Sequence, residues 1–308
     1  MNKITTIKNN SIKVGSHFQS GLSLIELMIA MVIGLFLLLS ISSVYLSNLK
    51  ADKSRDQYSL LEDNARLALD TMSQVIQHAG YTGSKAIMTA DPFITSQVKK
   101  NGSDCMVNND ALYTGFDKTK DDDTGAQFTG DRIGVVYLAN DPNLPGLATP
   151  EEVINFDCGG SIVPNQCQIG NAANMGRDAD RSRIYNAFYI NNKGQLNCIG
   201  SYTTGAQLIA DNIENMQISY GVDVDGDPNM SVDKYLDATA VAASPGGWGS
   251  VRSVQIAVLV KSDKEVKQTA EQRTYKLLDK SIKAPGGTNK DRYQRAVFST
   301  TVALEDNH

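Results

Sequence analysis

The sequence predicts an α+β protein, in which a long N-terminal helix precedes a β-rich domain of mainly antiparallel strands joined by long loops. Between Glu26 and Lys50 lie 23 residues without a formal charge. Residues 50–79 then place apolar side chains three and four positions apart, which is typical of an amphipathic helix. Beyond Gly80, runs rich in Val, Ile, Tyr, Phe and Thr alternate with polar stretches, as strands alternate with loops.

The composition is that of a folded protein. The 308 residues are 41% hydrophobic and 20% charged, which is enough apolar material for a core. The net charge of −5 argues against a nucleic-acid-binding protein whose whole surface is basic, although it leaves room for a local basic patch. The enzyme motifs H-E-x-x-H, G-x-S-x-G and G-x-x-x-x-G-K-[ST] do not occur, and we expect no enzymatic activity.

The N-terminal region has the charge pattern of a membrane anchor. Residues 1–21 carry Lys3, Lys8 and Lys13 and no Asp or Glu, so the positive-inside rule keeps this leader in the cytoplasm. The apolar run follows the leader and is long enough to cross a bilayer. Because no A-x-A site closes the run, it differs from a secretory signal peptide. We therefore expect residues 22–48 to span a membrane once.

Glu26 stands near the start of this apolar run, where a carboxylate is costly. A charge at the centre of a membrane helix costs about 2.5–3.5 kcal/mol, and less near an edge. One interpretation is that Glu26 only marks the membrane boundary. The other is that it has a cationic partner. Cleavage between Gly21 and Leu22 would create such a partner, an α-amine four residues before Glu26, in the same helix or in a neighbouring subunit.

The stretch G-L-S-L-I-E at residues 21–26, followed by the apolar run, resembles the class III signal of type IV pilins and pseudopilins. The resemblance implies that a prepilin peptidase cuts after Gly21 and N-methylates Leu22, a position where the family usually has Phe. It also implies that Glu26 sets the registration of subunits in a fibre. The anchor would then lie in the inner membrane, with the rest of the chain in the periplasm.

Residues 49–80 are expected to continue the apolar helix as an amphipathic one. No proline interrupts residues 24–79, and Gly80 is the expected stop. Gly34, inside the apolar half, either reflects how common glycine is in membrane helices or loosens the helix during assembly. The stripe predicted to face the core consists of Leu61, Ala65, Ala68, Met72, Val75, Ile76 and Ala79.

Residues 81–308 are expected to form the β-rich globular domain. The predicted strands are residues 131–139, 152–157, 183–190, 216–222, 251–260 and 295–304. The predicted surface loops are residues 99–130, 140–151, 159–182 and 223–250.

Four further segments look like the PilW-type minor pilins. They are NARLALDTMSQVIQHAGYTG, NIENMQISYGVDVDGD, VRSVQIAVLVKS and RAVFSTTVAL. The family often has Cys just after AGY-x-G, whereas this chain has Ser84, so no family disulfide is carried over. The resemblance implies a type IV pilin-like fold and a structural minor prepilin that primes pilus assembly within a tip complex. Its partners would be the prepilin peptidase, other minor pilins and the major pilin, and it would end in the fibre at the cell surface.

Two other functions remain open at this point. A pseudopilin of type II secretion would carry the same signal, although the YGVDVDGD segment and the C-terminus favour the pilus. A membrane-anchored periplasmic binding protein or adhesin that never polymerises would leave the Gly21–Leu22 bond uncut.

Four cysteines, Cys105, Cys158, Cys167 and Cys198, all lie beyond the anchor, where an oxidising compartment favours disulfides. Four cysteines allow three pairings, and none forms a C-x-x-C pair that would indicate zinc or redox chemistry. The pairing we favour is Cys158–Cys167 together with Cys105–Cys198. Buried free thiols are the alternative.

The acidic stretch DVDGDPNMSVD, residues 223–233, suggests a calcium loop. Asp223, Asp225 and Asp227 alternate, so their carboxylates could converge on one ion. However, an EF-hand needs Gly at its sixth position and Glu at its twelfth, where this chain has Pro228 and Lys234. The alternative is a solvated acidic turn. Calcium is the only cofactor that the sequence suggests.

Overall fold

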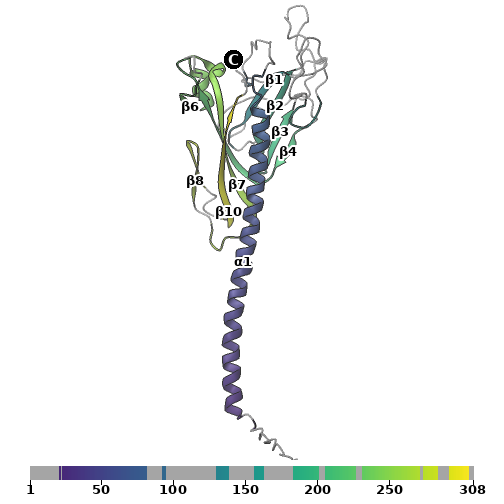
Figure 1. Ribbon diagram of the computed structural model, residues 1–308, viewed down its shortest axis with the longest axis vertical. Helices are drawn as coiled ribbons and strands as arrows, with labels where there is room; N and C mark the ends of the chain where they lie inside the picture. The colour runs from purple at the N-terminus through teal and green to yellow at the C-terminus, as the bar shows by residue number, and fades with distance from the viewer. Residues whose placement is uncertain are drawn as a thin grey trace, which may run out of the picture. The chain divides into compact units, whose positions relative to one another are not determined.

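The computed structural model describes residues 21, 23–81, 92–94, 130–138, 156–162, 183–200, 205–226, 231–270, 273–283 and 291–304 (Figure 1). Helix α1 comprises Leu24–Ile76, as the unbroken apolar and amphipathic patterns predict. The chain divides into two compact units, residues 1–52 and 53–308, and α1 contributes to both.

In the first unit, α1 exposes its apolar side chains. Leu24, Phe36 and Leu38 are each at least 66% exposed, although they are among the most hydrophobic residues of the chain. This part of α1 is apolar and long enough to cross a membrane. Such a surface is unfavourable in water, and it therefore requires lipid or other apolar helices around it.

The second unit contains two antiparallel four-stranded sheets. The first has the strand order β1-β2-β3-β4, and the second β10-β7-β5-β6. The first sheet consists of β1 (Ile133–Leu138), β2 (Arg183–Ile190), β3 (Leu196–Gly200) and β4 (Gln207–Ala210). The second consists of β5 (Ile213–Val222), β6 (Lys234–Leu236), β7 (Val251–Glu265) and β10 (Tyr293–Ala303).

The central strands confirm the predicted order of strands and loops, whereas several shorter elements differ from the prediction. Strand β2 coincides with the predicted residues 183–190, while β5 and β7 are longer than predicted. The prediction that residues 223–250 form a loop is wrong, because β6, helix α2 (Ala238–Ala243) and a 3₁₀ turn (Gly247–Ser250) lie there. These elements are only three to six residues long, so no periodic pattern marks them. Of the predicted strand 152–157, the described part forms only an isolated bridge, Phe156 with Ile162.

The part of α1 that follows Lys53 is the central element of the core. Its buried face comprises Gln57, Leu61, Ala65, Ala68, Leu69, Met72 and Ile76, which confirms most of the predicted stripe. Figure 1 shows the two sheets on either side of this part of α1, and side chains of both sheets complete the same cluster. The helix ends at Ile76, a few residues earlier than predicted, and Gly80 follows with a φ of 83° that glycine adopts readily.

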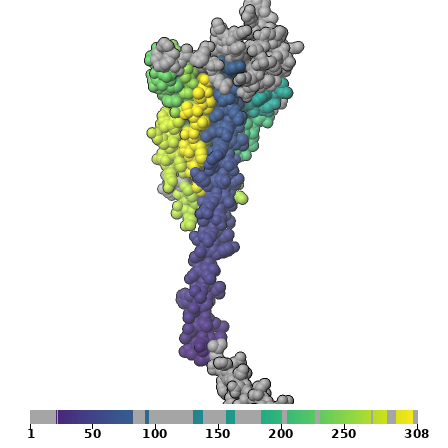
Figure 2. Space-filling model, viewed as in Figure 1, coloured from purple at the N-terminus to yellow at the C-terminus, as the bar shows by residue number. Residues whose placement is uncertain are grey.

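The second sheet also has a covered outer face. The hairpin of β8 (Thr274–Leu277) and β9 (Lys280–Lys283) packs there through a small apolar cluster that includes Leu277, Ala257 and Leu259. Figure 2 shows β10, in yellow, at the surface beside α1. Gln294 contacts the helix there, at 3.2 Å from the Ser54 hydroxyl.

Arg295 is a fully buried charge at the start of β10. Its guanidinium donates to Glu214 at 2.6 and 2.8 Å and to Asp291 at 2.7 and 2.6 Å, so two carboxylates share one cation. Hydrogen bonding from Arg295 lowers the pKa of Asp291 below its ordinary value. Because Glu214 lies in β5 and Arg295 in β10, the cluster links these two strands across the intervening β7. A buried guanidinium is stable only when its donors are satisfied, so the carboxylates are needed there.

Met72→Ala should reduce the free energy of unfolding by about 2–5 kcal/mol, because it leaves a cavity where a fully buried side chain packs. Leu67→Ala, on the exposed face of the same helix, should change it by about 0.5 kcal/mol or less. Urea unfolding of the full chain in detergent measures both. Equal losses would mean that α1 does not form the core in this register.

Candidate functional site

The residues of the N-terminal motif lie at the start of α1. Gly21 and Ser23 precede the helix, and the backbone N–H of Leu27 donates to the Ser23 carbonyl at 3.1 Å. Leu22 lies outside the described residues. Glu26 is exposed in the first helical turn, where the helix dipole favours a negative charge. The position of Glu26 is therefore compatible with a cationic partner from another molecule as well as with a boundary role.

Gly34 lies within an unbroken part of α1. A Cβ atom built at this position would meet no atom within 4 Å. A larger side chain would therefore fit in the isolated chain. Any requirement for glycine at this position must come from neighbouring molecules or from flexibility, and its role in assembly stays a prediction.

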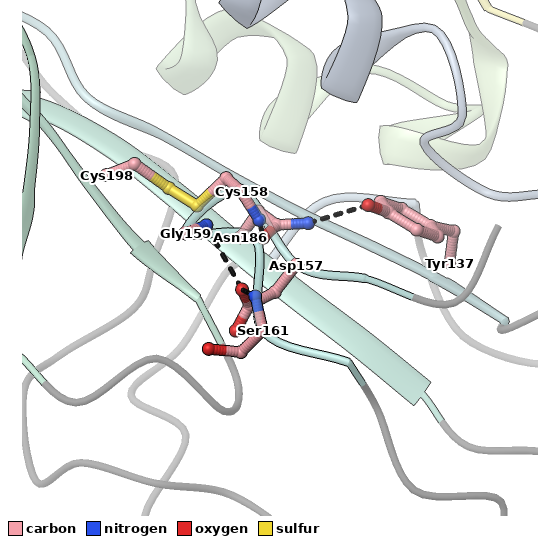
Figure 3. The surroundings of a disulfide bond; sticks show 7 residues. All are labelled: Tyr137, Asp157, Cys158, Gly159, Ser161, Asn186 and Cys198. Atoms are coloured by element: carbon pink, nitrogen blue, oxygen red, sulfur yellow. Dashed lines mark hydrogen bonds between the residues drawn. A yellow bond between two sulfur atoms is a disulfide. The ribbon is translucent and has the colours of Figure 1, made fainter.

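A disulfide joins Cys158 to Cys198, with a Cα–Cα distance of 6.3 Å (Figure 3). The favoured pairing of Cys158 with Cys167 and of Cys105 with Cys198 is therefore wrong. Sequence proximity suggested Cys158–Cys167, but Cys198 lies in the middle of β3, next to the loop that carries Cys158. Cys105 and Cys167 lie outside the described residues.

The disulfide belongs to a polar network that attaches residues 156–162 to the first sheet. The buried Asn186 of β2 accepts a hydrogen bond from the Cys158 backbone at 2.7 Å and donates to the Tyr137 hydroxyl at 2.9 Å. Asp157 accepts from the backbone N–H groups of Gly159 and Ser161 at 3.1 and 3.0 Å. Burial raises the pKa of Tyr137, so this phenol stays neutral.

Gly200 explains how Asp157 fits against β3. A Cβ atom at Gly200 would overlap the Asp157 side chain, so only glycine permits this approach. Neither residue can be identified from the sequence, because a contact between a loop and a strand 43 positions further along the chain leaves no local pattern.

The acidic stretch after β5 forms a cluster that differs from the predicted one. Oxygen atoms of Asp223, Asp225 and Asp233 lie within 4.8 Å of one another, while Asp227 lies outside the described residues. The β5–β6 pairing explains the arrangement, because Asp233 immediately precedes Lys234, which pairs with Val222. The structure thus joins two of the three predicted calcium ligands with a carboxylate that the alternate spacing did not select.

Protein groups already bond to this cluster. Asp233 Oδ2 accepts from the Val224 and Asp225 backbones at 2.8 and 3.4 Å. Asp223 accepts from the Gly226 backbone at 2.8 Å, and the Arg252 guanidinium lies 3.5 Å from its other oxygen. Carboxylate oxygens suit calcium, but Arg252 already supplies positive charge to the buried Asp223. Calcium binding therefore stays a prediction.

Comparisons with known proteins agree with the motifs. Residues 187–306 match the family model described as Type IV Pilus-assembly protein W, and residues 16–42 match that of the prokaryotic N-terminal methylation motif. No curated protein matches the chain. A solved structure similar to this chain is a type IV-like pilin from Thermus thermophilus, with 12% identity and a TM-score of 0.37, covering 79% of this chain and 95% of that one. The two family matches confirm the resemblance to PilW-type pilins.

Replacing both Cys158 and Cys198 with Ser should lower the free energy of unfolding by about 2–5 kcal/mol, because the unfolded chain loses a cross-link between residues 40 positions apart. Urea unfolding of the full chain under oxidising conditions measures the loss. An unchanged unfolding midpoint would mean that the disulfide does not stabilise the domain.

If the acidic cluster binds calcium, calorimetry on the full chain should detect heat that disappears in Asp225→Ala. Asp263→Ala, which removes an exposed carboxylate elsewhere, should bind as the native chain does. No heat and no calcium-dependent rise in melting temperature would leave the plain acidic turn as the answer.

Proposed function

We propose that this chain is a minor pilin that primes type IV pilus assembly as part of a complex at the fibre tip. Two observations together carry the proposal. Helix α1 has an exposed apolar segment with Glu26 in its first turn, and the C-terminal region matches a pilus-assembly family. In this role the chain works by packing against other subunits, and it performs no catalysis.

The charge pattern supports a single orientation in the inner membrane. The basic leader stays in the cytoplasm, residues 22–48 cross the bilayer, and residues 53–308 fold in the periplasm. A disulfide between Cys158 and Cys198 suits an oxidising periplasm. Prepilin peptidase then cuts between Gly21 and Leu22 on the cytoplasmic side and methylates the new amine.

Glu26 acts after this cut. The new α-amine belongs to Leu22, four residues before Glu26 in the sequence. When the helix leaves the membrane for the fibre, each amine needs a carboxylate within reach, because an unpaired charge in an apolar bundle is costly. Glu26 is the only charged residue between Lys13 and Lys50. It therefore pairs with the amine of a neighbouring pilin and fixes the axial position of the subunit.

Glu26→Ala should leave the protein inserted, cleaved and folded but should strongly reduce its incorporation into fibres. Insertion should even improve slightly, since the variant lacks a carboxylate that costs up to about 3 kcal/mol within a membrane. Glu26→Gln keeps the shape without the charge, and it should resemble Glu26→Ala. Sheared fibres are probed for this subunit at equal membrane levels of each variant.

Native incorporation of Glu26→Ala would contradict the proposed pairing and would make Glu26 a boundary residue. A chain that stays in the membrane, keeps residues 1–21 and never enters fibres would instead be a non-polymerising anchored binding protein. Incorporation into a secretion pseudopilus but not into pili would favour the type II secretion pseudopilin.

A further inference from the structure

The basic residues of the chain are unevenly distributed. Residues 261–295 contain ten Lys and Arg against five Asp and Glu, although the whole chain has a net charge of −5. The segment therefore carries a net charge of +5, and the remainder of the chain carries −10. A local basic patch was compatible with the composition, and the fold determines where it lies.

The strand register places part of this charge at one end of the second unit. Strands β5 and β7 pair along their length, with Ile213 opposite Val260 at one end and Val222 opposite Val251 at the other. The basic segment follows Val260, whereas the acidic cluster follows Val222. A ten-residue strand at about 3.3 Å per residue separates the two ends by roughly 30 Å. We call the first of these ends the basic end, with Lys261, Lys264, Lys267, Arg273, Lys283 and Arg292.

The basic end is also the end at which α1 enters this unit. The Gln57 side chain accepts a hydrogen bond from the Lys264 backbone at 2.8 Å, and Ser54 contacts Gln294. Lys50, where the uncharged run ends, is four residues before Ser54, which is about 6 Å along a helix. The basic end therefore stays close to the point where the chain leaves the membrane, however the two units are oriented.

Three acidic groups at this end bond to arginines, whereas Asp263 is exposed. Glu265 accepts hydrogen bonds from the Arg292 guanidinium at 2.8 and 3.0 Å. Glu214 and Asp291 both bond to the buried Arg295. The four lysines of the basic end outnumber this remaining carboxylate, so the surface potential there is positive. The pKa of Lys267 is lowered by burial and by the nearby charges of Arg273 and Arg295, as expected where cations gather.

We infer that the basic end docks on anionic phospholipid headgroups of the membrane that holds α1. The inference rests on the proposed membrane anchoring. Each Lys or Arg near an anionic lipid surface contributes about 1 kcal/mol of binding free energy, which changes the docking equilibrium about fivefold. The anchor also keeps the headgroups within reach of the basic end. Nucleic acid has the same charge but no such tether, so the membrane is the favoured partner. Docking would restrain the domain until the helix enters a fibre.

The test uses the full chain in nanodiscs of phosphatidylglycerol or of phosphatidylcholine, with lysines acetylated at low salt and quantified by mass spectrometry. Lys264 and Lys283, both exposed at the basic end, should react at least fivefold more slowly in phosphatidylglycerol. Lys234, exposed at the opposite end, should react equally in both lipids. The protection should disappear at 0.5 M salt, where the Debye length falls to roughly 4 Å.

Charge reversal gives a matched pair of variants. Lys283→Glu should weaken the protection of Lys264, whereas Lys234→Glu makes the same chemical change at the acidic end and should leave it intact. Equal reactivity of Lys264 in both lipids, in a chain that elutes with its nanodisc, would overturn docking alone. A chain that does not elute with lipid would overturn the anchoring and the docking together. Protection by duplex DNA but not by phosphatidylglycerol would assign the surface to nucleic acid instead.

Discussion

The chain must cover an apolar helical surface that it cannot bury itself. Residues 27–49 have no charge, and in the isolated chain their large side chains are exposed to solvent. At 1.5 Å per residue the run is about 35 Å long, which matches the hydrocarbon core of a bilayer. Lipid can cover this surface, and so can the helices of other subunits. Because either environment can cover this surface, the helix could exchange one for the other with few changes in its own fold.

The second half of α1 is covered by the chain itself. It buries one stripe against two sheets at once, so the domain is built around the element that also forms the anchor. Distant parts are then attached by specific contacts. The Cys158–Cys198 disulfide and Asn186 hold a loop against the first sheet, and Arg295 joins two strands of the second. Because these contacts lie far apart in sequence, they fix the tertiary arrangement rather than local structure.

The sequence was informative where the structure is local and periodic. The α1 stripe follows from a repeat of 3.6 residues. Strand β2 and the central part of β7 follow from runs rich in β-branched and aromatic residues, and the structure contains all three. Strands β6, β8 and β9 have three or four residues and exposed charges, so nothing distinguishes them from loops. The disulfide pairing and the place of Asp233 in the acidic cluster depend on strand register, which a single sequence does not specify. The basic end could not be predicted either, because its charges come from β7, β9 and segments that flank the strands.

The central claim is that the chain is processed as a prepilin before it works in a fibre. Mass spectrometry of the mature protein's N-terminus, isolated from membranes and from fibres, tests this most directly. We expect a first residue of Leu22 carrying one methyl group, with residues 1–21 absent, in both fractions. A mature protein that still carries residues 1–21, or one that begins near Ser40, would contradict the account.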